Sequence, residues 1–220
     1  METIKNLRSD CGQFILPIRT LQKISKDKKV KLLDVGGGEH LIKIFLPKNI
    51  EYYSLDCIGE QDLVHNLDTF PIPLKDKSFD IILCLETLEH TLYPHRVMKE
   101  LIRISKPETL FLLSMPNEYN LYCRMNFLLG KKTDVQEPFQ VIEKHLHIQL
   151  PRVKDIIKFF SSYIQIEEID YPWYSRSSAR NPNFKGRFFV FIDKFINKFF
   201  TKWSPSLFTR AVVVKGKIKK

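Results

Sequence analysis

The feature that most constrains the fold of this chain is a short apolar run that ends in an acid and three glycines. Val30 to Val35 reads V-K-L-L-D-V, and Gly36-Gly37-Gly38 follows directly. A buried parallel strand has this nearly continuous apolar composition, and glycines after it permit a tight turn. The free N–H groups at such a turn suit a nucleotide-like ligand. The sequence therefore predicts a strand, a glycine turn and a ligand at one place.

Apolar runs and amphipathic segments alternate along the rest of the chain. Further strands are predicted over 51–55, 63–64, 79–85, 109–115, 163–169 and 209–214, with helices over 14–24, 92–105, 151–162 and 188–203. The helix before the strand at 109 is expected to stop at Lys106-Pro107. Strands that alternate with helices favour an α/β fold with a doubly wound, mostly parallel sheet.

Length and composition indicate a single domain over 1–220. The chain has 220 residues, 44% of them hydrophobic, which suffices for one core. No apolar run approaches the roughly 20 residues that a membrane-spanning helix needs. The N-terminus lacks the pattern of a secretory signal, and the four cysteines form no C-x-x-C pair. We expect a cytoplasmic protein with reduced thiols.

The positive charge is concentrated at the C-terminus. Of the formal net charge of +10, ten Lys or Arg and one Asp after residue 184 contribute +9. The predicted helix 188–203 carries phenylalanines on one face and Arg187, Lys194, Lys198 and Lys202 beside them. This pattern favours a helix that covers the sheet, and the alternative is peripheral contact of 187–203 with the inner face of an anionic membrane. Such local charge argues against nucleic-acid binding.

The glycine turn does not have the spacing of a dinucleotide site. Counting G-x-G-x-x-G from Gly36 gives Gly38 and then Leu41 where the third glycine should stand. Asp34 would also repel a pyrophosphate, whereas it would attract a cationic amino-acid end or a sulfonium. A nicotinamide oxidoreductase is therefore a third choice among the functions considered.

At this point the sequence resembles the class I S-adenosylmethionine-dependent methyltransferases, whose first motif reads roughly L-D-x-G-C-G-x-G. Here Leu33 to His40 reads L-D-V-G-G-G-E-H, with Gly37 in place of a common Cys and His40 in place of the last glycine. Asp56, 22 residues after Asp34, matches the acid that in this family binds both ribose hydroxyls. A carboxylate suits a vicinal diol because it accepts two hydrogen bonds.

Further motifs follow in the family's order. They are Asn66-Leu67-Asp68 for the adenine wall, the segment Asp76 to Asp80, Glu86-Thr87-Leu88-Glu89-His90, the helix Arg96 to Pro107, and Ser114-Met115-Pro116-Asn117. In these motifs the chain is similar to methyltransferases of types 11 and 23, to ubiquinone-type O-methyltransferases and to MetW-like proteins of methionine biosynthesis. The resemblance implies a seven-stranded Rossmann-like sheet with an antiparallel C-terminal strand. It also implies a cofactor-binding half over 30–117, after a leading helix region over 1–29, and a substrate-side half over 118–220.

The resemblance implies S-adenosylmethionine as the cofactor and a set of residues that bind it. This set comprises Asp34, Gly36, Gly37, Gly38, Asp56, Cys57, Asn66, Leu67, Asp68, Leu85 and Glu86. The catalytic candidates, near the ends of the fourth and fifth strands or in the insertion after them, are His90, His145 and Glu89, because imidazole is the natural base near neutral pH. His147, two residues after His145, would point to the same side.

The E-x-x-E-H spacing is also similar to a divalent-metal site in ubiquinone-type O-methyltransferases. Glu86, Glu89 and His90 are thus weak metal candidates, and we expect no metal. The leading hypothesis is methyl transfer to a small or lipid-linked acceptor, an O- or C-nucleophile of a glycan, quinone or lipid precursor. The alternative is a catalytically silent cofactor-binding protein that acts as a membrane or partner adaptor. The sequence leaves the acceptor and the oligomeric state open.

Overall fold

The fold was analysed in a computed structural model that describes residues 9–25, 27–131, 141, 146–172, 195 and 197–219. Its strands are β1 (Val30–Val35), β2 (Ile50–Asp56), β3 (Leu63–Val64), β4 (Phe79–Leu85), β5 (Ser105–Pro116), β6 (Ile164–Asp170) and β7 (Ala211–Ile218). The α-helices are α2 (Ile15–Leu21), α3 (Pro94–Ile104), α4 (Leu121–Leu128), α5 (Val153–Ser161) and α8 (Pro205–Phe208). Short helical turns are η1 (Ser9–Phe14), η2 (Lys43–Phe45), η3 (Leu88–His90) and η4 (Asn197–Thr201).

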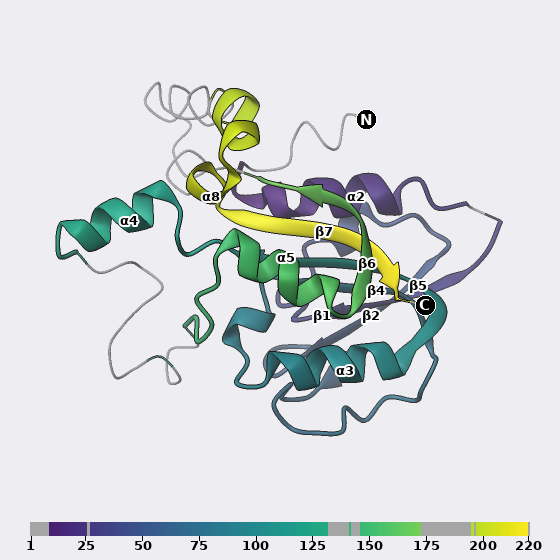
Figure 1. Cartoon of the computed structure of the whole chain (residues 1–220). Helices are drawn as coiled ribbons and strands as arrows, with labels where there is room; N and C mark the ends of the chain where they lie inside the picture. Colours follow the sequence, from purple (N-terminus) through teal and green to yellow (C-terminus); the bar gives the residue numbers. More distant parts are fainter. Residues whose placement is uncertain are drawn as a thin grey trace.

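The strands form one seven-stranded sheet in the order β3-β2-β1-β4-β5-β7-β6 (Figure 1). Strands β1 to β5 pair in parallel, and β7 runs antiparallel to both β5 and β6. The predicted α/β class, the seven-stranded sheet and its antiparallel C-terminal strand are confirmed.

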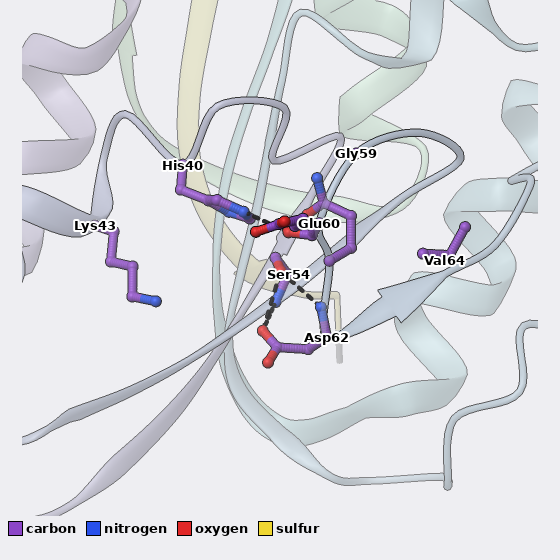
Figure 2. A pocket seen from close by; sticks show the side chains of 8 residues that line it. His40, Lys43, Ser54, Gly59, Glu60, Asp62 and Val64 are labelled. Atoms are coloured by element: carbon purple, nitrogen blue, oxygen red, sulfur yellow. Dashed lines mark hydrogen bonds between the residues drawn. The ribbon is translucent and has the colours of Figure 1, made fainter.

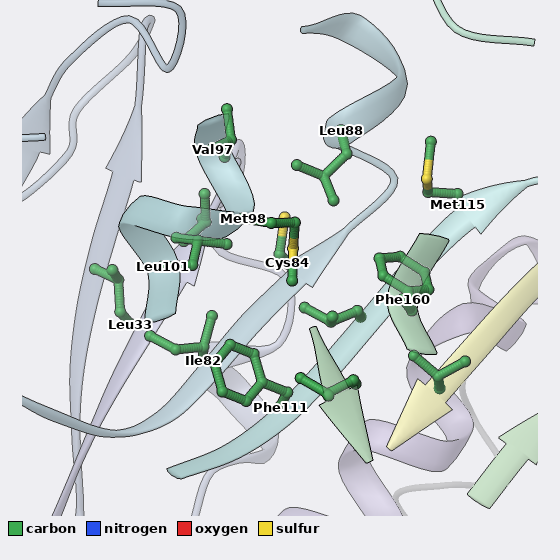
Figure 3. Close-up of a cluster of buried hydrophobic side chains, with 14 of the residues drawn as sticks. Leu33, Ile82, Cys84, Leu88, Val97, Met98, Leu101, Phe111, Met115 and Phe160 are labelled. Carbon is green, nitrogen blue, oxygen red and sulfur yellow. The ribbon is translucent and has the colours of Figure 1, made fainter. Parts of the chain in front are cut away.

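Alternating side chains on the central strands bury two separate cores, one on each face of the sheet. Leu33 and Ile82 belong to a core that also contains residues of α3 and α5, such as Leu101 and Phe160 (Figure 3). Their neighbours Leu32 and Ile81, which point the other way, pack with residues of α2. Helices therefore cover both faces, as a doubly wound sheet requires.

Several predicted boundaries are wrong for physical reasons. The helix α3 ends at Ile104, and β5 begins at once with Ser105, so that Pro107 lies inside a strand. An irregular register between β4 and β5 at this point accommodates the proline, which cannot donate to the sheet. The last strand starts at Ala211 and continues to Ile218, beyond the expected 209–214.

Two segments of the second half differ from, or exceed, the prediction. The sequence did not predict helix α4. Its apolar residues lie all round the helix and none of them is buried, so they show no helical periodicity. Of the predicted helix 188–203, residues 188–194 and 196 lie outside the described residues, and 197–201 form the π-helical turn η4. Among the described residues, no helix combines the length and apolar character that would let it cross a membrane.

The parallel strands direct their carboxyl ends to one edge of the sheet. From β1 the sheet grows through β2 and β3 on one side, and the chain then crosses back to place β4 on the other side of β1. The strand order therefore reverses between β1 and β4. Ligands of open α/β sheets bind outside the carboxyl ends of the strands at such a reversal. The predicted site residues follow β1, β2, β4 and β5, so this edge holds the candidate site.

Candidate active site

The turn after β1 requires glycine at its first position. Gly36 has φ +73, and its N–H donates to the carbonyl of Leu55 at 2.7 Å. A Cβ at Gly36 would overlap the side chain of Thr87, which lies just after β4. The absence of a side chain therefore lets the two loops at the strand reversal pack together.

Asp34 is a buried carboxyl beneath this turn. It is 6% exposed, and the hydroxyl of Tyr52 donates to its Oδ2 at 2.7 Å. Burial raises the pKa of Asp34 to about 6, against the opposing effects of the Tyr52 hydrogen bond and of His40. A Cβ at Gly37 would stand 3.3 Å from Oδ2 of Asp34. Glycine thus keeps the approach to this carboxyl open.

Asp56 is held in place by backbone N–H groups. Its Oδ2 accepts from Gly38 at 3.1 Å, and its Oδ1 accepts from Cys57 at 2.6 Å. Each oxygen keeps a further lone pair for another donor. Cys57 is largely exposed, yet the partial loss of solvent around its thiol, and secondly the neighbouring Asp56, raise the pKa of that thiol. The end of β2 therefore offers a fixed carboxylate with capacity for two more hydrogen bonds.

The predicted adenine wall consists of residues with different tasks. Asn66 is exposed, and its side-chain oxygen accepts from the N–H of Asp68 at 2.9 Å. Leu67 is buried in the core. Asp68 accepts from the N–H groups of Leu92 and Tyr93 at 3.0–3.1 Å, so its carboxylate anchors the segment before α3. Asn66 is left as the polar group of the three that faces outward.

The end of β4 carries two carboxyl groups in a largely buried setting. Glu86 follows Leu85 with φ +51 and accepts from the hydroxyl of Ser114 at 2.8 Å. Burial raises the pKa of Glu86 to about 7. Glu89 is fully buried, and neither of its carboxyl oxygens has a hydrogen-bond partner in the part of the chain that the structure describes. Burial first, and Glu86 second, raise the pKa of Glu89 well above its ordinary value.

Two imidazoles lie beside Glu89. Nε2 of His90 is 3.8 Å and Nε2 of His147 is 3.9 Å from Oε1 of Glu89, and the two rings meet edge to face at 4.8 Å. The other nitrogen of His147, Nδ1, lies 2.6 Å from Oε1 of Glu118. Backbone N–H groups of residues 148 and 149 donate to the carbonyl of Glu89 and so fasten the insertion to η3.

We call Glu89, His90 and His147 the Glu89 cluster. One potential ligand atom from each of the three lies within 4.8 Å of the others, so the group could hold a metal ion. Glu86, a weak metal candidate from the sequence, is not in this group, and its carboxyl accepts from the hydroxyl of Ser114. His145, the third predicted catalytic residue, lies outside the described residues.

Sequence reasoning missed two partners that shape the site. Glu118 is 29 positions from His147, and no local motif connects them. Tyr52 could have been found, because side chains alternate along a strand and Tyr52, Ser54 and Asp56 share one face of β2. Asp34 and Ser54 are paired across β1 and β2, which brings Tyr52 near the turn.

Comparisons with known proteins agree with the fold. The model of a methyltransferase domain family matches residues 6–164. A methyltransferase from Mesorhizobium loti has 11% identity over 95% of this chain and 99% of its own, with a TM-score of 0.57. One from Aquifex aeolicus has 13% identity over 94% and 92%, with a TM-score of 0.52. Both are described as dependent on S-adenosylmethionine.

The same fold also occurs in the [4+2]-cyclase SpnF, with 12% identity over 93% of this chain and 82% of that one, and a TM-score of 0.52. None of the curated proteins matches the sequence. The structural likenesses therefore establish the fold, and the family model, which spans most of the chain, establishes the family. Together with the ordered motifs, they show that this chain belongs to the methyltransferase domain family, as a class I member that uses S-adenosylmethionine.

Proposed function

We propose that the protein transfers the methyl group of S-adenosylmethionine to an O- or C-nucleophile of a small or lipid-linked acceptor, and that the Glu89 cluster receives the acceptor's proton. The observation that carries this proposal is the fully buried Glu89 carboxyl, without a hydrogen-bond partner among the described residues and beside two imidazoles. A buried polar group left unpaired costs stability, which indicates a task in ligand binding or catalysis.

The cofactor would lie across the carboxyl ends of β1, β2 and β4. Asp56 would accept from the two ribose hydroxyls through the lone pairs that Gly38 and Cys57 leave free. Asp34 would face the ammonium of the amino-acid end. Asn66 and Leu67 would border the adenine, Leu85 would line the middle of the pocket, and Glu86 would end it beside the methyl group.

The reaction needs no redox partner. An electron pair of the acceptor's O- or C-nucleophile would displace the methyl group from sulfur, and the electron pair of the broken carbon–sulfur bond would stay on sulfur, which gives the thioether S-adenosylhomocysteine. The acceptor's proton leaves to a base. Because the sulfonium already activates the methyl group, the protein mainly aligns the two reactants and accepts this proton.

His147 is the best-placed proton acceptor of the cluster. A carboxylate at Nδ1, here Glu118 at 2.6 Å, holds the proton on that nitrogen and leaves Nε2 with its lone pair. Nε2 points to the Glu89 side of the ring, where the acceptor would enter. Glu118 is thus a positioning residue, and it would also stabilise the imidazolium that forms.

The surface next to this site favours a lipid-linked acceptor within the proposed class. Helix α4 begins five residues after β5 and extends away from the sheet (Figure 1). Its Phe127 is 83% exposed, and Trp203, in the segment before α8, is 75% exposed. Arg124 of α4 contacts Ser206 of α8, which joins the two segments. From residue 195 onward the chain has seven Lys or Arg and no acid, which suits an anionic surface.

The acceptor can be found by incubating the protein with methyl-labelled cofactor and a cell extract divided into lipid, small-molecule and macromolecular fractions. We expect label in the lipid or small-molecule fraction, and loss of this label with His147→Gln. His95→Gln is the matched control, because His95 lies on α3 and bonds Tyr163. Label in the macromolecular fraction alone would contradict the proposed acceptor class.

A chelator distinguishes proton transfer from metal-assisted chemistry at the same cluster. If His147 acts as the base, excess EDTA leaves the rate unchanged. Loss of activity with EDTA that added Mn²⁺ or Zn²⁺ restores would instead assign the cluster to a metal ion. Sedimentation with anionic vesicles tests the adaptor alternative: binding that Phe127→Ser and Trp203→Ser abolish, in a protein that labels no acceptor, would favour it.

A further inference from the structure

A continuous chain of hydrogen bonds runs from the buried Asp34 to the loop between β2 and β3. Tyr52 bonds Asp34 at 2.7 Å, Nδ1 of His40 bonds the Tyr52 hydroxyl at 3.1 Å, and Nε2 of His40 bonds the backbone carbonyl of Glu60 at 2.8 Å. Figure 2 shows His40 directed across the pocket toward Glu60. We call Asp34, Tyr52 and His40 the Asp34 relay.

The relay determines how many protons its members share. The Glu60 carbonyl can only accept, so Nε2 of His40 must carry a proton. The Tyr52 hydroxyl has one proton to donate. If it donates to an ionised Asp34, then Nδ1 of His40 must also carry a proton for its contact to be a hydrogen bond. All three bonds therefore form with an ionised Asp34 only when His40 is an imidazolium, and otherwise Asp34 itself must hold the proton.

His40 has a backbone conformation that glycine adopts more easily. Its φ is +56, in the left-handed region, where a side chain other than glycine is strained. The resembling methyltransferase motif has glycine at this position, which would remove the strain. Strain retained beside a ligand site is a sign of function.

The charged groups around the relay come from each neighbouring element. Lys43 of η2 lies 5.3 Å from the centre of the Tyr52 ring. Asp56 at the end of β2 opposes ionisation of Asp34, whereas His40 favours it. Asp62, on the β2–β3 loop, bonds Ser54 and acts on Tyr52. Acids predominate among these groups, and His40 is the member of the relay that can balance them with a positive charge.

We propose that His40 is a positioning residue for the amino-acid end of the cofactor: as an imidazolium it fixes Tyr52 as the donor to Asp34 and holds that carboxyl in its ionised form. The cofactor's ammonium then meets a carboxylate whose direction is fixed by Tyr52. The inference rests on the proposed placement of the amino-acid end at Asp34. It gives His40, which departs from the family motif, a role in binding.

The relay itself is tested in the ligand-free protein by ¹⁵N NMR of the imidazole nitrogens. At about pH 7 we expect protons on both nitrogens of His40 and, in Tyr52→Phe, loss of the Nδ1 proton. A wild-type His40 with an unprotonated Nδ1 would overturn the inference. Tyr53→Phe is the matched control, because Tyr53 is the next residue of β2 and its hydroxyl donates to Glu51 instead.

The binding role is tested with His40→Asn, because asparagine tolerates the left-handed region and carries no charge. Without the imidazolium the pKa of Asp34 rises. At a pH below that pKa, each unit of rise lowers the ionised fraction of Asp34 by up to about tenfold. For a rise of one unit we expect S-adenosylhomocysteine to bind about fivefold more weakly at about pH 6, where half of the wild-type Asp34 is ionised, and to regain wild-type affinity at about pH 8.5.

5′-Methylthioadenosine separates this role from a general change of the pocket, because it retains the ribose and adenine and lacks the amino-acid end. Its affinity should be the same for wild type and His40→Asn at every pH. An equal loss for both ligands, or a loss for S-adenosylhomocysteine that does not change with pH, would overturn the inference. If neither ligand binds the wild type, the cofactor assignment itself fails, and the NMR result still reports on the relay.

Discussion

The two sides of the site treat their carboxyl groups differently. On the proposed cofactor side, Asp56 and Asp68 each accept two or more backbone N–H groups, and Asp34 accepts from Tyr52. On the proposed acceptor side, Glu89 is fully buried, and neither of its carboxyl oxygens has a hydrogen-bond partner among the described residues. The proposed cofactor side is thus organised before ligand binds, whereas the proposed acceptor side has polar groups that a reactant could engage. Changes on the two sides should therefore have separable effects on binding and on rate.

The largest effect should come from His147→Gln on the acceptor side. Loss of a general base lowers the rate about 10²- to 10⁴-fold. Glu118→Gln should lower it about 10- to 100-fold, because it removes only the orienting carboxylate. Single-turnover rates with the identified acceptor measure both changes, while the affinity for S-adenosylhomocysteine stays at the wild-type value. An equal loss of affinity for S-adenosylhomocysteine would show that the two sides do not act separately on binding and on rate.

Asp34→Asn should weaken cofactor binding and raise the free energy of unfolding. The folded protein has the Asp34 pKa raised to about 6 from an ordinary value of 3.8. The folded state therefore holds the proton more tightly, and the associated stability is present below about pH 4 and is lost as the pH rises through about 6. Asparagine removes this loss, so the free energy of unfolding at about pH 7.5 rises by at most about 3 kcal/mol.

Urea unfolding of wild type and Asp34→Asn at several pH values measures this difference. The two proteins should converge near about pH 4, because Asp34 is then protonated in the folded state. A difference that is constant with pH would show that Asp34 does not titrate in this way.

Asp56→Ala should weaken cofactor binding about 100-fold, because it removes the acceptor of two hydrogen bonds, each worth about 1.5 kcal/mol when one partner is charged. Calorimetry with S-adenosylhomocysteine measures the loss. Glu60→Gln is the control, since only the backbone carbonyl of Glu60 takes part in the relay. Unchanged affinity in Asp56→Ala would show that this carboxylate does not bind the ribose.

A smaller effect is expected from the turn itself. Gly36→Ala brings a Cβ against Thr87 and should cost about 2 kcal/mol in the free energy of unfolding. Gly38→Ala should cost about 1 kcal/mol, because Gly38 also has a positive φ but its Cβ would have no neighbour closer than 4.0 Å. Thermal unfolding of the two variants compares them, and equal losses would exclude the steric contact with Thr87 as the cause.

The same contrast explains what the sequence could predict. The strands β1 and β4 were predicted to the residue, because their apolar runs are almost entirely buried, and β2 and β3 were predicted to within one residue at each end. Ordered motifs also predicted Asp34, Gly36 and Asp56 as cofactor-binding residues, because each lies at the end of a strand or directly after it. These features depend on local sequence and on the edge where parallel strands terminate.

Long-range pairings could not be predicted in the same way. The contact of His147 with Glu118 depends on how the insertion folds back over η3. Asp68 stands where the motif predicts a ligand-binding acid, yet its carboxylate accepts a hydrogen bond from the backbone N–H of Leu92. Helix α4 has no apolar face that differs from its others, so hydrophobic periodicity gave no signal there.

The central claim is that the carboxyl ends of β1 and β2 form a preorganised site for an adenosyl amino acid. Isothermal titration of the wild-type protein with S-adenosylhomocysteine, and with NAD in parallel, tests this claim most directly. The account predicts micromolar binding of S-adenosylhomocysteine and none of NAD. Binding of NAD, or failure of S-adenosylhomocysteine to bind a folded protein, would contradict it.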